Sequence, residues 1–108
     1  MDVIAERKLI VHYSDGSTGP VWLRIARPVD RGNGDWTCEV EGTGLRLWEG
    51  PTSFWGVGSW HALMLAQGFL RRMLSYETER GATFHWEDSE HVMSVEELFV
   101  LGEIKDEP

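Results

Sequence analysis

Cysteine is almost absent from this 108-residue chain, which contains Cys38 alone. A single cysteine cannot form an internal disulfide, and one cysteine by itself is not a metal site. The lack of disulfides suits a reducing compartment, so we expect a cytoplasmic protein. A chain of this length can bury one hydrophobic core without covalent cross-links.

Long apolar runs are also missing. No stretch approaches the roughly 18 consecutive apolar residues of a membrane-spanning helix, so we expect no membrane span. The first twenty residues lack a basic start followed by an apolar segment, and we therefore expect no signal peptide.

Basic residues are few, with ten Lys and Arg against eighteen Asp and Glu, which gives a net charge of −8. An acidic chain repels phosphate backbones, so nucleic-acid binding is not expected. The same charge would attract a basic partner protein. Ordinary solubility is the other explanation for a net negative charge.

Known catalytic motifs are absent too. The segment 56–60 does not have the G-x-S-x-G pattern of a nucleophile turn. The glycine-rich segment 30–35 lacks both the GK[ST] ending and the following helix of a phosphate-binding loop, so we interpret it as a hairpin connection. Cys38 occupies an inward position of a predicted strand, where a free cysteine acts as a small hydrophobic residue. We therefore expect no catalytic residue and no cofactor, and a non-enzymatic protein is favoured.

The strongest positive signal is an amphipathic helix between Gly56 and Gly81. Gly58 and Ser59 are suitable N-cap residues, and Gly81 can adopt the left-handed conformation that follows a helix end. Apolar residues recur with helical spacing on one face, namely Ala62, Leu63, Ala66, Phe69, Leu70, Met73 and Tyr76.

Short strands are predicted around this helix. Alternating apolar and polar residues indicate strands at 3–13, 21–27, 36–41 and 45–48, with a further short strand at 83–86. Consecutive strands with short links form an antiparallel meander, and its apolar face needs a covering helix. We predict an α+β fold in two layers: a four- to five-stranded antiparallel meander with one long amphipathic helix packed on one face.

Residues 1–108 are expected to form a single compact domain. Ser94–Phe99 resembles a serine-capped helical turn, and residues 102–108 are expected to be a frayed tail. The uncovered face of the predicted sheet would display His12, Trp22, Arg24, Thr37, Glu39, Arg46 and Trp48.

Two large apolar residues interrupt the polar face of the predicted helix. Trp60 and Met64 align with Gln67 and Arg71 at helical spacing, and Trp, Met and Arg are enriched in protein interfaces. Either the C-terminal tail covers this stripe, or a partner or a second copy does. A two-fold helix contact would bury the stripe on both copies, so we expect a homodimer. The alternative interface is the open sheet face with Trp22 and Trp48.

Histidine and acidic residues gather between positions 85 and 91. If His85 and Glu87 share a strand side and His91 folds back, the three could bind a first-row metal. The spacing matches no compact metal motif, so a solvated acidic loop is the preferred interpretation and no metal site is expected. His12 and His61 stand alone in the sequence.

Several stretches resemble a family of small uncharacterised bacterial proteins, a domain of unknown function with a G-V-D-S-W-Q-A-L-like helix start. The matching stretches are 36–38, 56–66, 79–81 and 84–86. Gly58 replaces the expected Asp and His61 the expected Gln. The resemblance implies a bacterial origin and a compact domain, and it supplies no activity.

The sequence therefore favours a non-enzymatic protein-binding module, such as an immunity-like accessory protein. One alternative is a small metal-dependent enzyme or binder that uses His85, Glu87 and His91. The other is a purely structural homo-oligomer.

Overall fold

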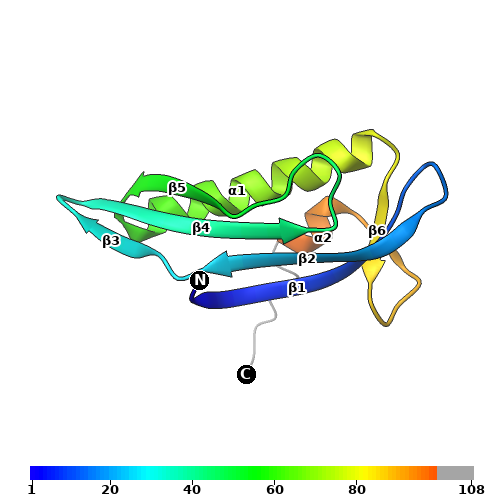
Figure 1. The fold of residues 1–108 in the computed structure, drawn as a ribbon, viewed down its shortest axis with the longest axis horizontal. Helices are drawn as coiled ribbons and strands as arrows, with labels where there is room; N and C mark the ends of the chain where they lie inside the picture. The colour runs from blue at the N-terminus through cyan, green and yellow to red at the C-terminus, as the bar shows by residue number, and fades with distance from the viewer. Residues whose placement is uncertain (100–108) are drawn as a thin grey trace, which may run out of the picture.

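The computed structural model describes residues 1–99, which form one seven-stranded sheet, a long helix and a short helix. Every strand pairing is antiparallel, and α1 lies along one face of the sheet (Figure 1). In chain order the elements are β1 (Val3–His12), β2 (Thr18–Ala26), β3 (Val29–Gly32), β4 (Asp35–Thr43), β5 (Thr52–Val57), α1 (Gly58–Glu79), β6 (Thr83–Trp86), β7 (Val92–Met93) and α2 (Val95–Phe99).

The centre of the sheet is a meander, as predicted. β1 pairs with β2, β2 with the second half of β4, and β5 with the opposite edge of β4. β3 pairs with the first half of β4 and prolongs β2 after a break at Pro28, which cannot donate to the ladder. Asn33 and Gly34 close the β3–β4 hairpin with φ of 55° and 83°, the left-handed conformations of a type I′ turn.

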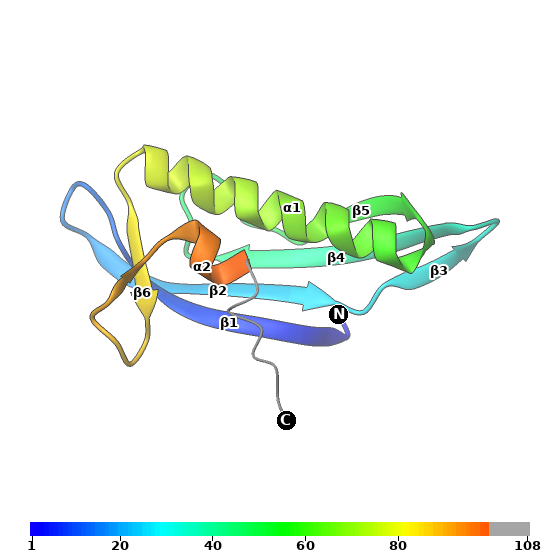
Figure 2. The ribbon, with the colours of Figure 1, turned by 180° about the vertical axis from the view of Figure 1, so that it is seen from behind.

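Helix α1 returns the chain from β5 to the other side of the meander, where β6 pairs with β1. β6 crosses β1 steeply in Figure 2, so the sheet is strongly twisted at this end. The α+β class, the antiparallel sheet and the covering helix are confirmed. The strand count is higher than the predicted four to five, because β3 and β7 are short additions at hairpins.

The hydrophobic core lies between α1 and the sheet. Ala62, Ala66 and Leu70 recur along the buried side of α1, as the helical spacing predicts, and Leu74 is buried beside them. Leu9, Val21, Cys38 and Val40 face them from three strands. Tyr76, predicted on the same face of the helix, is instead 43% exposed near the end of the helix. A side chain at Gly56 would place its Cβ 2.4 Å from the backbone nitrogen of Ala62. The absence of that Cβ lets α1 pack directly against β5.

Two local predictions are wrong. Residues 45–48 are not a strand, and the fourth strand of the meander is instead β5, which we had interpreted as a lead into the helix. The N-cap of α1 is Val57, with no side-chain cap, because Gly58 already belongs to the helix and donates its N–H to Gly34 O at 2.9 Å. Gly81 does adopt the left-handed conformation, with φ of 94°.

The end of the described chain follows the predicted capping pattern. Ser94 Oγ accepts the backbone N–H of Glu97 at 3.3 Å, and Glu97 Oε1 accepts the backbone N–H of Ser94 at 3.3 Å. Phe99 packs against the core. The predicted frayed tail, residues 102–108, lies outside the described residues. Within residues 1–99, no helix has both the length and the apolar character needed to cross a membrane.

Candidate functional site

The outer edge of β5 is a free sheet edge within the described part of the chain. Among these residues β5 pairs only with β4. The N–H of Gly58 donates to Gly34 O, which extends the β4–β5 pairing by one residue beyond Val57 and Asp35. Because backbone groups alternate in direction along an antiparallel strand, Ser53, Trp55 and Val57 direct their N–H and C=O groups away from β4. Such an edge can accept a further strand.

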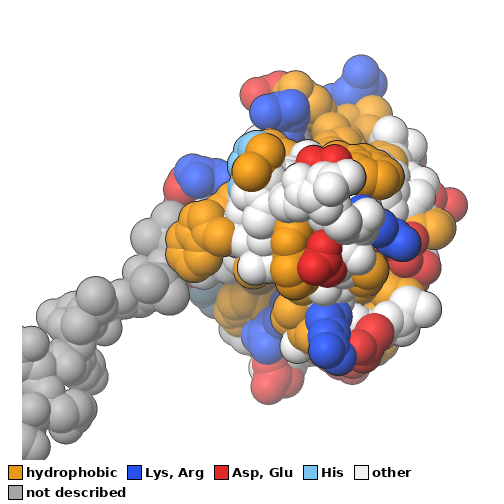
Figure 3. Space-filling view, turned by 90° about the vertical axis from the view of Figure 1, so that its left-hand side faces the viewer, with side chains coloured by type: hydrophobic (Ala, Val, Ile, Leu, Met, Phe, Trp, Pro, Cys, Tyr) orange, Lys and Arg blue, Asp and Glu red, His pale blue; other side chains and the backbone are white. Residues whose placement is uncertain are grey.

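Large apolar side chains surround this edge. Trp55 is 62% exposed, Val57 77% and Trp60 75%, and Met64 follows one turn later at 37%. Trp55 and Val57 lie on the open face of the sheet, while Trp60 projects from the first turn of α1. Figure 3 shows this end of the molecule, where hydrophobic side chains reach the surface in several patches among scattered charges. Because tryptophan is enriched in protein interfaces, two exposed tryptophans here make this end a candidate contact surface.

The turn from β5 into α1 fixes these side chains. Gly58 has a φ of 83°, which a residue with a Cβ rarely adopts. The backbone N–H of Val57 then donates to His61 Nδ1 at 2.9 Å. One of the three outward donors of β5 is therefore already satisfied within the chain, which leaves the donors of Ser53 and Trp55 for a further strand. We call Ser53, Trp55, Val57 and Trp60 the β5 edge site.

Only half of the predicted partner stripe on α1 is uncovered. Trp60 and Met64 are exposed, as expected. Arg71 forms an ion pair with Glu96 of α2, and Gln67 lines an apolar groove with Leu98 and Phe99. The C-terminal segment thus covers the Gln67 and Arg71 end of the stripe. The described residues leave Trp60 and Met64 exposed, and a partner or a second copy at that end stays a prediction.

Trp22 and Trp48 do not share a face. Trp22 is half-buried on the open face, with Arg24 5.0 Å and Lys8 5.5 Å from its ring centroid. Trp48 lies on the helix side of the sheet, with its ring centroid 4.9 Å from that of Phe69 and its Nε1 donating to Thr52 Oγ1 at 3.0 Å. The prediction that Trp48 faces outward is wrong because residues 44–51 form a loop that folds toward α1.

The predicted histidine and acid cluster is not assembled. His85 bonds to His12, Glu87 pairs with Lys8 at 2.9 Å, and His91 pairs with Glu97 at 3.2 Å. Among residues 1–99 no group of three His, Cys, Asp or Glu could hold a metal ion. Hydrogen bonding from the Ser94 backbone N–H, followed by that from His91, lowers the pKa of Glu97.

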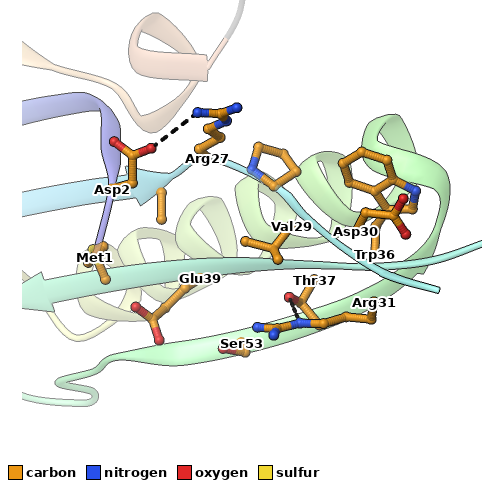
Figure 4. A pocket seen from close by; sticks show the side chains of 12 residues that line it. Met1, Asp2, Arg27, Val29, Asp30, Arg31, Trp36, Thr37, Glu39 and Ser53 are labelled. Carbon is orange, nitrogen blue, oxygen red and sulfur yellow. Dashed lines mark hydrogen bonds and ion pairs between the residues drawn. The ribbon is translucent and has the colours of Figure 1, made fainter.

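A hollow of about 580 Å³ with mixed polar and apolar lining opens beside the break between β2 and β3 (Figure 4). Asp2 pairs with Arg27 on one side of it at 3.6 Å, and Arg31 Nε donates to Thr37 Oγ1 at 2.9 Å. Its described lining residues include no His and no Cys. The hollow therefore offers charged and hydroxyl groups but no imidazole or thiol for nucleophilic chemistry.

Sequence reasoning missed two features. Glu77, only 2% exposed, shares the buried side of α1 and accepts the backbone N–H groups of Arg46 and Leu47 at 2.9 and 2.6 Å. At helical spacing Glu77 falls on the same side of α1 as Ala66 and Leu70, and this spacing could have identified it as a buried residue. Trp55 and Val57 were missed because β5 was not predicted, although Ser53, Trp55 and Val57 alternate with Phe54 as strand residues do.

Comparisons with protein-family models, curated proteins and solved structures found no match to this chain. The resemblance to a bacterial family of unknown function therefore stays a prediction.

Proposed function

We propose that this chain is a non-enzymatic protein-binding module that receives an extended segment of a partner protein along the β5 edge site. The observation behind the proposal is that, within residues 1–99, the outer edge of β5 has no paired strand and lies beside three exposed apolar side chains. In strand addition, backbone hydrogen bonds give affinity and alternate side chains give specificity. Ser53 and Trp55 supply outward backbone groups, and Trp55, Val57 and Trp60 supply apolar contact area.

The net charge of the chain, rather than the charges beside the edge, favours a basic segment. Glu39 and Asp35 lie directly across from Ser53 and Val57 in the pairing register. Between them on β4 is Thr37, whose hydroxyl accepts the Nε–H of Arg31 at 2.9 Å, so the charges beside Trp55 are mixed. The net charge of −8 would steer a basic partner toward the chain.

The backbone directions give a sharp test. Proline is tolerated on an edge strand where its missing N–H would have faced outward. Ser53→Pro should therefore remove one outward donor without disturbing the β4–β5 ladder, whereas Ser53→Ala keeps that donor and serves as the matched control. The wild-type chain would be used to isolate partners from the native lysate, and their affinities for each variant would then be measured with purified protein.

We expect Ser53→Pro and Trp55→Glu each to weaken binding at least about tenfold, and Ser53→Ala and Val92→Glu to leave it unchanged. Val92 is a suitable control because it is also exposed but lies on β7, at the other end of the sheet order. Partner binding should also slow hydrogen exchange at the amides of Ser53 and Trp55. Undiminished binding by Ser53→Pro and Trp55→Glu would contradict the proposal.

A further inference from the structure

The structure brings together two histidines that are 73 positions apart in the sequence. His12 ends β1 and His85 lies on β6, and both side chains face the open side of the sheet because Ile10 pairs with His85 and His12 with Thr83. Their Nε2 atoms are 2.9 Å apart. The two rings are stacked, with centroids 5.0 Å apart and planes at 26°.

The hydrogen bonds determine which ring nitrogens carry protons. His85 Nδ1 lies 2.7 Å from the backbone oxygen of Trp86, and a carbonyl oxygen only accepts, so Nδ1 must be protonated. In neutral His85, Nε2 is then an unprotonated acceptor, and His12 Nε2–H is the donor between the rings. The lone pair of His85 Nε2 thus points toward His12.

This arrangement has the features of a metal ligand held in place before metal binds. Metal-binding histidines commonly donate the second ring N–H to a backbone carbonyl, which fixes the tautomer and the ring orientation. His85 already has that contact with Trp86 O. His12 is exposed, so its ring can adjust to a metal.

We propose that His12 and His85 form a two-histidine site for a divalent transition-metal cation, Cu²⁺ or Ni²⁺. Metal–imidazole distances are about 2.0–2.1 Å, so nitrogens 2.9 Å apart subtend an angle of about 90° at a shared metal. That is the angle between neighbouring ligands in square-planar and tetragonal sites, which Cu²⁺ and Ni²⁺ favour. A tetrahedral zinc site would need the nitrogens about 3.3 Å apart, which requires a larger movement of the exposed His12 ring.

Metal binding requires both Nε2 atoms to be unprotonated. The proton on His12 Nε2 moves to Nδ1 of the same ring, so a neutral pair binds the cation without net proton release. Because residues 1–99 supply no third His, Cys, Asp or Glu here, water fills the other metal positions. Thr18 and Thr83 pair with His12 in the two neighbouring strands and can bond to those waters.

The site is independent of the proposed β5 edge, because it joins β1 and β6 rather than β4 and β5. A metal that binds only the folded chain raises its unfolding midpoint, and at a hundredfold excess over Kd we expect a rise of roughly 10 °C. The matched variants are His12→Gln and His85→Gln. His91→Gln is the control, since His91 is exposed and pairs with Glu97 instead.

The experiment is a calorimetric titration of the full chain with Ni²⁺ and with Cu²⁺ at pH 7.5, together with thermal unfolding of each variant without metal. We expect one equivalent of metal bound by wild type and by His91→Gln, and at least a tenfold weaker affinity for His12→Gln and for His85→Gln. Nitrogen hyperfine splitting from two imidazoles in the Cu²⁺ spectrum would support the same site. Absence of one-equivalent binding by wild type, or unchanged affinity in either His12→Gln or His85→Gln, would overturn the proposal.

Discussion

Glu77 accepts the backbone N–H of Leu47 at 2.6 Å across 30 positions of sequence. Its carboxylate also accepts the N–H of Arg46, and both donors belong to the loop between β4 and β5. A buried carboxylate on α1 thus holds the loop that carries Trp48 toward the helix. The loop therefore meets the helix through a buried polar contact as well as through apolar packing.

Truncation of Glu77 should destabilise the fold strongly. Glu77→Ala would remove a buried carboxylate and leave the two part-buried backbone donors without their acceptor, so we expect the free energy of unfolding to fall by about 2–4 kcal/mol. Glu77→Gln keeps an acceptor oxygen and should cost less. Urea unfolding of the two variants measures the difference. A loss below about 0.5 kcal/mol for Glu77→Ala would show that the loop does not need this carboxylate.

Leu70 tests the buried side of α1. Because this side chain is only 2% exposed, Leu70→Ala should lower the free energy of unfolding by about 2–5 kcal/mol. Leu65→Ala is the matched control on the same helix, since Leu65 is 39% exposed, and it should cost under about 1 kcal/mol. Equal losses in the two variants would mean that the packing side of the helix is misassigned.

Self-association is the prediction that follows from the stripe on α1. Trp60 and Met64 remain uncovered by the described residues, so a two-fold contact between copies would bury both. We expect the wild type to sediment as a dimer at tens of micromolar and the double variant Trp60→Glu with Met64→Glu to be a folded monomer. A monomeric wild type refutes the dimer. A double variant that stays dimeric would move the interface elsewhere, for example to the open face near Trp22.

Asp15 gives a pH dependence. Hydrogen bonds from the Ser17 hydroxyl, then the Ser17 backbone N–H and then Arg46 lower the pKa of Asp15 to about 2. A carboxyl with a lowered pKa stabilises the folded state fully above its unfolded pKa of about 4, and loses that contribution as the pH falls through about 2.

The stability difference between wild type and Asp15→Asn should therefore be present at neutral pH and shrink toward pH 2. An NMR titration of the Asp15 carboxyl carbon measures its midpoint directly, and Ser17→Ala should raise that midpoint. A midpoint near 4 in wild type would show that these hydrogen bonds do not form in solution.

Cys38 should be unreactive in the folded chain. Its side chain is buried, Sγ donates to Ala26 O at 3.4 Å, and burial raises the pKa of the thiol. Since the thiolate is the reactive species, we expect a disulfide reagent to modify native protein at least about 100-fold more slowly than protein in denaturant. Rapid modification of native protein would indicate that β4 opens readily.

The sequence by itself determined the features that depend on short-range periodicity. Helical spacing placed Leu70 on the buried side of α1, and strand alternation placed Cys38 inward, because each pattern involves residues within one element. Gly81 was recognisable as a helix end because its backbone conformation is a local property.

Only the tertiary structure decided which distant elements meet. Pairing of β6 with β1 brings His85 to His12, and no spacing within either strand encodes that pairing. The loop that turns Trp48 toward Phe69 is held by Glu77 on another element, so strand alternation placed that tryptophan on the wrong face. Contacts of this kind form only after long loops close, and their geometry depends on the packing of the whole core rather than on local preference.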